Sequence, residues 1–257
     1  MKIYIMTDLE GPAMISRFNQ TRDVTPEDKI RWMRLLTGEV NACVDGILDA
    51  DADAEVIVWD AHGSGGIIEE EFHRDAKLIA RGPISPPYFL DESFDALMFV
   101  GQHARMGTGG VLCHTYSSKS IEYYKINGVE LGEFGCRALM AGTMGVPTIL
   151  CTGDDVAVEE AQELVPNIVG AAVKQALGRE LAIHMSHGAA CDLIRERAAE
   201  ACGKVDEIEP YFFEGPYTQE IRMLEGKGIQ GLLDAGWEYV DARTASKTAD
   251  DICELRV

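Results

Sequence analysis

The sequence predicts an α/β protein with a doubly wound, mostly parallel sheet, helices on both faces, and a smaller C-terminal α+β subdomain. Two observations predict this class. Short apolar runs alternate with helical patterns over the first 165 residues, and each run is apolar on both faces, as strands of a covered parallel sheet are. Strand, helix and strand in succession imply right-handed crossovers. We therefore expect residues 1–165 to form the α/β domain and residues 166–257 the subdomain.

The elements of the first part follow from local patterns. Strands are expected at 3–6, 56–59, 96–100 and 148–151. A helix should begin at Pro26, because Thr25 is a good N-cap and proline suits the first turn. Its apolar stripe is expected to comprise Ile30, Met33, Val40, Val44, Ile47 and Leu48. Two further helices are expected at about 131–142 and 156–164.

The pattern weakens after residue 165. Residues 167–177 are compatible with a strand or a helix, 189–202 with a helix and 211–223 with a strand. The glycine-containing, charged stretch 224–236 is typical of a loop with a short helix.

Composition excludes several function classes. The 257 residues include 23 Lys and Arg against 43 Asp and Glu, a formal net charge of −20, which disfavours nucleic acid and anionic membrane surfaces as partners. The 7 cysteines are odd in number and contain no C-x-x-C pair, which favours reduced thiols and a cytoplasmic location. No run of apolar residues is long enough for a transmembrane helix.

Polar side chains follow three of the four expected strands. Asp8 and Glu10 follow the first strand, Asp60 and His62 the second, and His103 the third. In open α/β sheets the carboxyl ends of the strands form the binding site, near the topological switch point. We therefore expect these side chains to converge at one edge of the sheet.

Imidazoles mixed with carboxylates, without thiolates, indicate the kind of ion. This donor set suits Zn²⁺, Mn²⁺ or Co²⁺ better than Ca²⁺. Two metal ions that share one bridging carboxylate would explain so many ligands, and such ion pairs are common in hydrolytic enzymes. The alternative is a scatter of strand-end caps and surface polar groups.

Later segments add candidates and alternatives. His114 lies eleven residues after His103, and Glu133 lies near a helix start between two glycines, where a solvated cap is the competing interpretation. Cys113 beside His114 suggests a thiol nucleophile only weakly, because adjacent residues point opposite ways in an extended chain. Asp154 after the fourth strand is interpreted as a helix cap.

Together these motifs resemble the DppA-type D-aminopeptidases, peptidase family M55. The family's S-x-D-x-E-G signature stands here as residues 6–11, with Met6 in place of serine, and its N-D-S-H landmark corresponds to residues 59–62. The G-x-H-A-R, G-V-x-x-H and I-N-x-x-x-x-G-E segments correspond to residues 101–105, 110–114 and 126–133. Matches at 146–147, 153–155 and 171–175 extend the resemblance over about residues 1–180.

The resemblance implies a dinuclear zinc site, with Mn²⁺ or Co²⁺ as alternative metals. The metal ligands that it implies are Asp8, Glu10, His62, His103 and Glu133. Of these, Asp8 would bridge both ions. His114 would be the catalytic residue beside the ions, and Asp60 would orient His62 or the backbone turn behind the ligands. The implied activity is an aminopeptidase acting on short peptides or amino-acid amides with D-amino acids. The family also implies a ring-shaped homo-oligomer, such as a decamer, with a secluded chamber.

Two other function classes remain at this stage. One is a metal-dependent amidase on a non-peptide amide, because specificity would lie in loops 12–24, 63–72 and 105–120, where the resemblance is thin. The other is a non-catalytic metal-binding protein, which the presence of His114 beside a full set of ligands disfavours.

Overall fold

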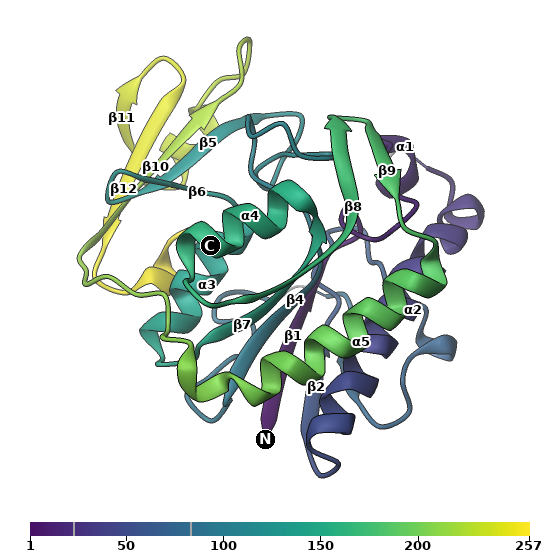
Figure 1. The fold of residues 1–257 in the computed structure, drawn as a ribbon. Coiled ribbons are helices and arrows are strands. Elements are labelled where there is room, and N and C mark those ends of the chain that lie inside the picture. The colour runs from purple at the N-terminus through teal and green to yellow at the C-terminus, as the bar shows by residue number, and fades with distance from the viewer. Residues whose placement is uncertain (23, 83) are drawn as a thin grey trace.

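The computed structural model describes residues 1–22, 24–82 and 84–257, which form two sheets (Figure 1). The larger sheet has the strand order β3-β2-β1-β4-β7-β8-β9. Its strands are β1 (Lys2–Thr7), β2 (Glu55–Trp59), β3 (Lys77–Ile79), β4 (Ala96–Gln102), β7 (Thr148–Asp154), β8 (Val169–Gly178) and β9 (Leu181–His184). β9 is antiparallel to β8, and the other neighbouring pairs are parallel.

Helices cover both faces of this sheet. The described α-helices are α1 (Phe18–Thr21), α2 (Pro26–Ala50), α3 (Glu133–Thr143), α4 (Asp155–Leu164), α5 (His187–Gly203) and α6 (Gln230–Asp234), and of these α2, α3, α4 and α5 pack on the sheet. The long helices α2 and α5 pack against each other on one side, whereas α3 and α4 contact β4, β7 and β8 from the other (Figure 1). The predicted fold class, doubly wound and mostly parallel, is confirmed.

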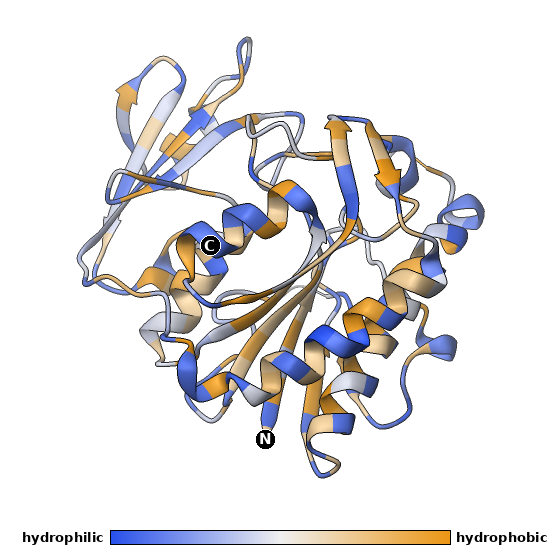
Figure 2. Ribbon diagram, viewed as in Figure 1, coloured by the Kyte–Doolittle hydropathy of each residue, from blue (hydrophilic) through white to orange (hydrophobic). Residues whose placement is uncertain are grey.

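The core lies between the central strands and these helices. Every residue of β4 and β7 is buried, and so is every residue of β1 except the first. Figure 2 shows these strands as a largely apolar centre with polar residues on the outer helix surfaces. This double-sided burial explains why the four strands were visible in the sequence as short, continuous apolar runs.

α2 begins as predicted but faces the sheet with a slightly different stripe. The Thr25 side chain accepts a hydrogen bond from the Asp28 amide, which caps the helix. Ile30, expected in the apolar stripe, is 45% exposed. The buried residue in this turn is Lys29, whose ammonium donates to the carbonyl oxygens of Ser64 and Gly65. The stripe prediction was therefore wrong at Ile30, because a lysine anchored to a loop turns the first helical turn away from the sheet.

The second sheet is antiparallel and has the order β11-β12-β10-β5-β6. Its strands are β5 (Ile121–Ile126), β6 (Val129–Leu131), β10 (Tyr217–Met223), β11 (Glu238–Asp241) and β12 (Thr244–Ala249). Residues 121–131 thus pair with residues from the end of the chain, while β8, β9 and α5 belong to the main sheet layer. The two sheets do not divide the chain at residue 165, and a domain boundary there stays a prediction.

Within the described part of the chain, no helix has the length and apolar character needed to cross a membrane.

Candidate metal centre

The centre lies at the topological switch point of the main sheet. The chain passes from β1 outward to β2 and β3, then returns to the other side of β1 with β4. The loop leaving β1 approaches the end of β4 closely there, since the Gly11 amide donates to the Gly101 carbonyl at 2.7 Å. A Cβ on Gly11 would lie 2.1 Å from the Gly101 carbonyl carbon, so the approach requires glycine.

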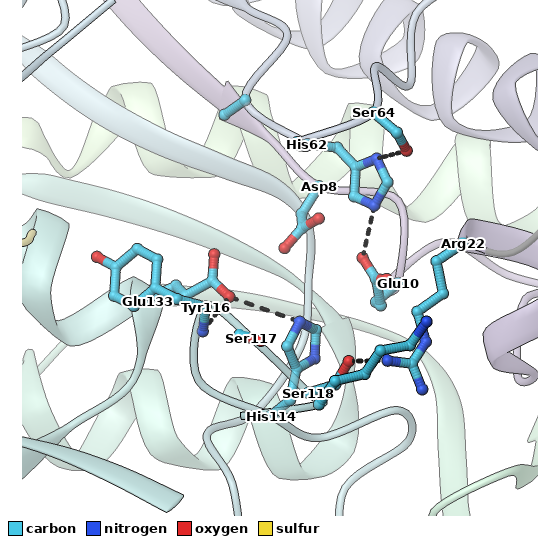
Figure 3. A pocket seen from close by; sticks show the side chains of 13 residues that line it. Asp8, Glu10, Arg22, His62, Ser64, His114, Tyr116, Ser117, Ser118 and Glu133 are labelled. Carbon is cyan, nitrogen blue, oxygen red and sulfur yellow. Dashed lines mark hydrogen bonds and ion pairs between the residues drawn. The ribbon is translucent and has the colours of Figure 1, made fainter. Parts of the chain in front are cut away.

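This crevice collects the side chains expected from three strand ends. A pocket of about 310 Å³ is lined by Asp8, Glu10, His62, His114 and Glu133. Figure 3 shows the side chains of Asp8, Glu10 and His62 pointing toward those of His114 and Glu133. His103 is 3% exposed and lies directly behind them. The pocket volume is at the lower end of the range for small-ligand sites.

His103 is the centre of the group. Its Nε2 lies 3.3 Å from Asp8 Oδ2 and 3.2 Å from Glu133 Oε1. It belongs to two sets of three potential metal-binding residues, one with Asp8 and Glu10 and one with His114 and Glu133. His62 contacts the group at Glu10, because its Nε2 lies 3.5 Å from Glu10 Oε2.

The three histidines are held in one ring orientation. Nδ1 of His103 faces the Ala104 carbonyl oxygen at 2.9 Å, and Nδ1 of His114 faces that of Leu112 at 2.8 Å. Nδ1 of His62 lies 3.2 Å from the Ser64 hydroxyl and 3.3 Å from the Gly65 carbonyl oxygen. A carbonyl accepts but cannot donate, so Nδ1 of His103 and of His114 carries a proton. The Nε2 atoms of all three rings face the carboxylates, and each can ligate a metal once it carries no proton.

The donor atoms fit a metal. Two ligands about 2.1 Å from one tetrahedral ion lie about 3.4 Å apart, close to the nitrogen–oxygen separations in this group. Glu10 Oε2 is buried, makes no hydrogen bond within the described residues and has His62 Nε2 3.5 Å away, so a cation is needed to balance its charge when His62 is neutral. Imidazole and carboxylate donors without thiolates suit zinc, manganese or cobalt.

Electrostatics in the group reflect burial and close packing of charge. Burial and the charge of Glu10 raise the pKa of Asp8 to about 6. Burial also opposes ionisation of Glu133, but hydrogen bonding to His103 outweighs it and lowers the pKa of Glu133 to about 2. Neighbouring carboxylates overcome burial at His62 and raise its pKa to about 9. Such opposed shifts within one crevice are typical of functional sites.

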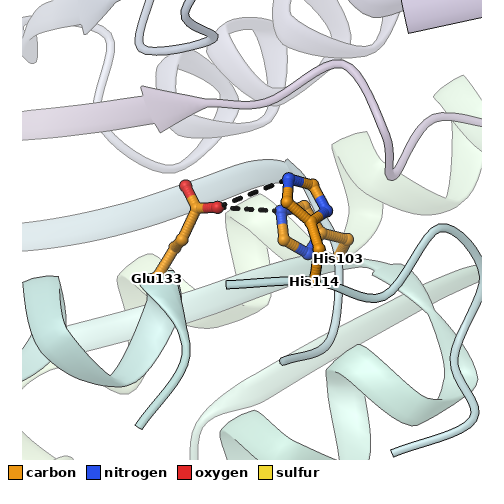
Figure 4. A group of neighbouring side chains, drawn as sticks. All are labelled: His103, His114 and Glu133. Atoms are coloured by element: carbon orange, nitrogen blue, oxygen red, sulfur yellow. Dashed lines mark hydrogen bonds and ion pairs between the residues drawn. The ribbon is translucent and has the colours of Figure 1, made fainter. Parts of the chain in front are cut away.

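His114 differs from the other imidazoles. Its ring stacks on that of His103 with centroids 3.9 Å apart, and its Nε2 lies 3.7 Å from Glu133 Oε1 (Figure 4). Burial and the positive charge of His103 lower the pKa of His114 to about 4. A neutral ring with a free Nε2 in the pocket is suited to accept a proton.

The remaining candidates lie behind the pocket. Asp60 accepts hydrogen bonds from the Gly66 and Ile67 amides and so fixes the loop that carries the Gly65 carbonyl, rather than contacting His62 directly. Asp154 caps α4 by accepting from the Ala157 amide, as predicted.

Sequence reasoning missed two buried cations. The Arg137 guanidinium lies 3.7 Å from Glu133 Oε2 and above the rings of Trp59, Tyr88 and Tyr116. The i,i+4 spacing from Glu133 was the available signal. The buried Lys174 ammonium donates to the carbonyl oxygens of Glu10, Pro12 and Ile15. Nothing local in the sequence indicated that contact, which spans more than 150 residues.

Comparison with known proteins agrees with this geometry. The profile of the D-aminopeptidase family Peptidase_M55 matches residues 1–256. The chain belongs to peptidase family M55. The match continues well beyond residue 180, where the resemblance of the motifs ended. This membership confirms the prediction of a hydrolytic enzyme of the metallopeptidase class.

Two relatives of this family can be compared directly. A D-aminopeptidase of Bacillus subtilis (strain 168) is 33% identical over 213 residues, which cover 82% of this chain and 77% of the relative. A solved structure described as Zn-dependent D-aminopeptidase DppA from Bacillus subtilis, a self-compartmentalizing protease, superposes with a TM-score of 0.92. It is 30% identical, and the match covers 99% of this chain and 93% of that one.

Proposed function

We propose that the chain is a zinc-dependent aminopeptidase that hydrolyses short peptides or amino-acid amides, with preference for D-amino acids, through a dinuclear metal site. The observation that carries the proposal is the convergence of three carboxylates and three imidazoles, five of them lining one small pocket and His103 in contact with Asp8 and Glu133. The relatives described as D-aminopeptidases support the choice of substrate class.

We assign the metal ligands as Asp8, Glu10, His62, His103 and Glu133. Asp8 would bridge the two ions, because it lies in the middle of the group in Figure 3 and shares His103 with Glu133. Three carboxylates and three imidazoles are more donors than the four that a single tetrahedral ion takes, which supports two ions rather than one. When bound, divalent ions polarise a substrate carbonyl and make water a better nucleophile at neutral pH.

The chain's own residues would perform the remaining steps. His114 is neutral near pH 7 and presents Nε2 to the pocket, so it would accept a proton from the attacking water and deliver it to the leaving amine. Its ring is kept in place by the Leu112 carbonyl and by stacking on His103. A carboxylate of the group would hold the free amino group of the substrate, which distinguishes an aminopeptidase from an endopeptidase.

The neighbour described as self-compartmentalizing supports the further proposal of a homo-oligomer that encloses its active sites. We propose that this oligomer is a ring of ten subunits. We also propose a cytoplasmic location, which is consistent with reduced thiols, because all 7 cysteines are free.

The decisive experiment combines metal analysis with a substrate panel. Purified protein should contain two zinc ions per chain by mass spectrometry of the metal content. It should hydrolyse D-amino-acid dipeptides and D-amino-acid amides faster than their L counterparts. One ion per chain would refute the dinuclear assignment, and a preference for L substrates would refute the stereochemical one. Hydrolysis confined to non-peptide amides would replace the aminopeptidase proposal with an amidase.

A further inference from the structure

We propose that Arg137 is a positioning residue, which fixes the carboxylate of Glu133 so that one of its oxygens, Oε1, faces the metal. This rests on the proposed metal site and adds a residue that does not itself line the pocket. Arg137 follows Glu133 by about one turn of α3, and its Nη2 lies 3.7 Å from Glu133 Oε2. Both side chains are buried.

The two oxygens of Glu133 have different surroundings. Oε1 accepts a hydrogen bond from the Tyr116 amide at 2.9 Å and lies 3.2 Å from His103 Nε2 and 3.7 Å from His114 Nε2. Oε2 lies toward the guanidinium of Arg137. Figure 4 shows Oε1 directed at both imidazoles, while the other oxygen points away from them. A carboxylate held at both oxygens can rotate little, so it offers Oε1 to an ion beside the imidazoles.

A cage of three aromatic rings holds the guanidinium of Arg137. Its carbon lies 5.2 Å from the centroid of the Trp59 ring, 5.6 Å from that of Tyr116 and 5.9 Å from that of Tyr88. Aromatic faces stabilise a cation and bring no negative charge that would compete with a carboxylate. The cage therefore keeps the charge of Arg137 in place and leaves it available to Glu133.

The cage is itself fixed by other parts of the fold. The Trp59 and Tyr88 rings stack with their centroids 4.2 Å apart. The Tyr88 hydroxyl donates to a main-chain oxygen of Val257, and the Tyr4 hydroxyl donates to the Tyr88 carbonyl at 2.5 Å. Tyr116 supplies both a ring to the cage and the amide that binds the carboxylate. The orientation of this proposed ligand is thus tied to β1, to β2 and to Val257.

The first test measures zinc affinity by competition with a chelator. Partners that orient a metal ligand typically contribute about 10–100-fold to metal affinity, so Arg137→Met should weaken zinc binding by about this factor. Arg137→Lys should recover most of the affinity, because an ammonium group also binds aromatic faces and balances the charge of Glu133. Arg195→Met is the control, since Arg195 pairs with Asp49 outside the pocket, and it should leave zinc affinity unchanged.

A double-mutant cycle with Glu133→Gln distinguishes positioning from a general structural effect. Glu133→Gln removes the charge that Arg137 holds. In that background Arg137→Met should therefore change zinc affinity by no more than about twofold. The double variant removes both charges of the ion pair, so it should fold even where Arg137→Met alone leaves a buried carboxylate unpaired. Circular dichroism of each metal-free protein checks the folding.

Two outcomes would overturn the proposal. One is equal zinc affinity in Arg137→Met and wild type. The other is an equal loss of affinity in the wild-type and Glu133→Gln backgrounds, because Arg137 would then act through the fold and not through Glu133.

These affinities do not depend on turnover, so they separate this proposal from the proposed function. Wild type that binds zinc but hydrolyses no peptide would reject the aminopeptidase, while the expected coupling in the cycle would keep the role of Arg137. Wild type that binds no zinc would overturn both proposals.

Discussion

His114 is the residue on which the proposed chemistry depends most directly. Replacing it with alanine should lower kcat by about 10²–10⁴-fold, because a positioned proton acceptor is lost while the proposed metal ligands remain. Zinc content per chain, measured on the same preparation, should stay at the wild-type level. His73→Ala is the matched control, since His73 contacts Asp45 outside the pocket. Full activity in His114→Ala would contradict its role as a proton acceptor, and loss of zinc would indicate that His114 is a metal ligand.

Glu39 should give the protein a distinctive dependence of stability on pH. Burial raises the pKa of Glu39 to about 8, although the Ala13 amide and the charge of Lys174 oppose this. Between pH 4.5 and about 8 the folded state therefore binds a proton that the unfolded state has lost. Stability falls as pH rises through this window, by at most about 1.4 kcal/mol per pH unit.

Glu39→Gln removes this titration and keeps an oxygen for the Ala13 amide. Melting temperatures measured from pH 5 to pH 8 should show the variant gaining stability relative to wild type as the pH rises. Parallel curves for the two proteins would show that Glu39 is ionised in the folded state throughout the range.

At the level of single residues, the sequence revealed side chains whose chemistry stands out at a strand end. Asp8, Glu10 and His103 were found in this way. Arg137 and Lys174 were missed because their roles depend on burial and on partners distant in the chain. Burial converts an ordinary arginine or lysine into an anchor for a carboxylate or for a loop, and a sequence without an alignment does not show which cations are buried.

Among the elements, the segment after β1 is held by a contact from β8. The Lys174 ammonium joins three carbonyl oxygens of residues 10–15 and is fully enclosed, so it fixes the backbone that presents Glu10. Lys174→Met leaves the Glu10 and Ile15 carbonyls without this donor, at about 1–3 kcal/mol each, whereas the Pro12 carbonyl keeps the Ile15 amide. We expect the free energy of unfolding to fall by about 3 kcal/mol or more.

The same variant should bind zinc more weakly, as measured by competition with a chelator. Lys247→Met is the control, because Lys247 also donates to a carbonyl oxygen, that of Glu254, but is half-buried and makes this bond at the surface. That control should change stability by less than about 0.5 kcal/mol. Zinc affinity equal to wild type in Lys174→Met would show that residues 10–15 keep their conformation without the hydrogen bonds from Lys174.

The predicted elements were most accurate where local pattern and burial agree. The four buried strands and the capped start of α2 are of this kind. Residues 211–216, expected to belong to a strand, precede β10, which begins only at Tyr217. Residues 167–177 were ambiguous between strand and helix and form most of β8, because pairing with β7 decides the conformation. The pairing of β5 with β10 joins segments about 90 residues apart and has no local signal.

For the whole molecule, metal binding should contribute to stability. Without cations, three carboxylates are buried together, and the raised pKa of Asp8 reflects that cost. Ligands that bind only the folded state stabilise it by about 2.7 kcal/mol at a hundredfold excess over Kd, which corresponds to at least about 5 °C in a domain of this size.

Chelation should therefore abolish activity and lower the melting temperature, measured by calorimetry. Zinc should restore both, whereas Mg²⁺, which prefers oxygen ligands, should restore neither. Hydrolysis that persists after the metal has been removed completely would contradict the proposed site.

The close approach of the chain at the ends of β1, β4 and β7 has a consequence for how this protein tolerates mutation. A side chain on Gly11 would meet the Gly101 backbone, one on Gly101 would meet the Asp8 carbonyl oxygen at 2.2 Å, and one on Gly153 would meet that of Gln102 at 2.1 Å. None of the three lines the pocket. A saturation library selected for activity should nevertheless retain only glycine at all three positions. The positions that retain only glycine would then identify the topological switch point of the sheet without a structure.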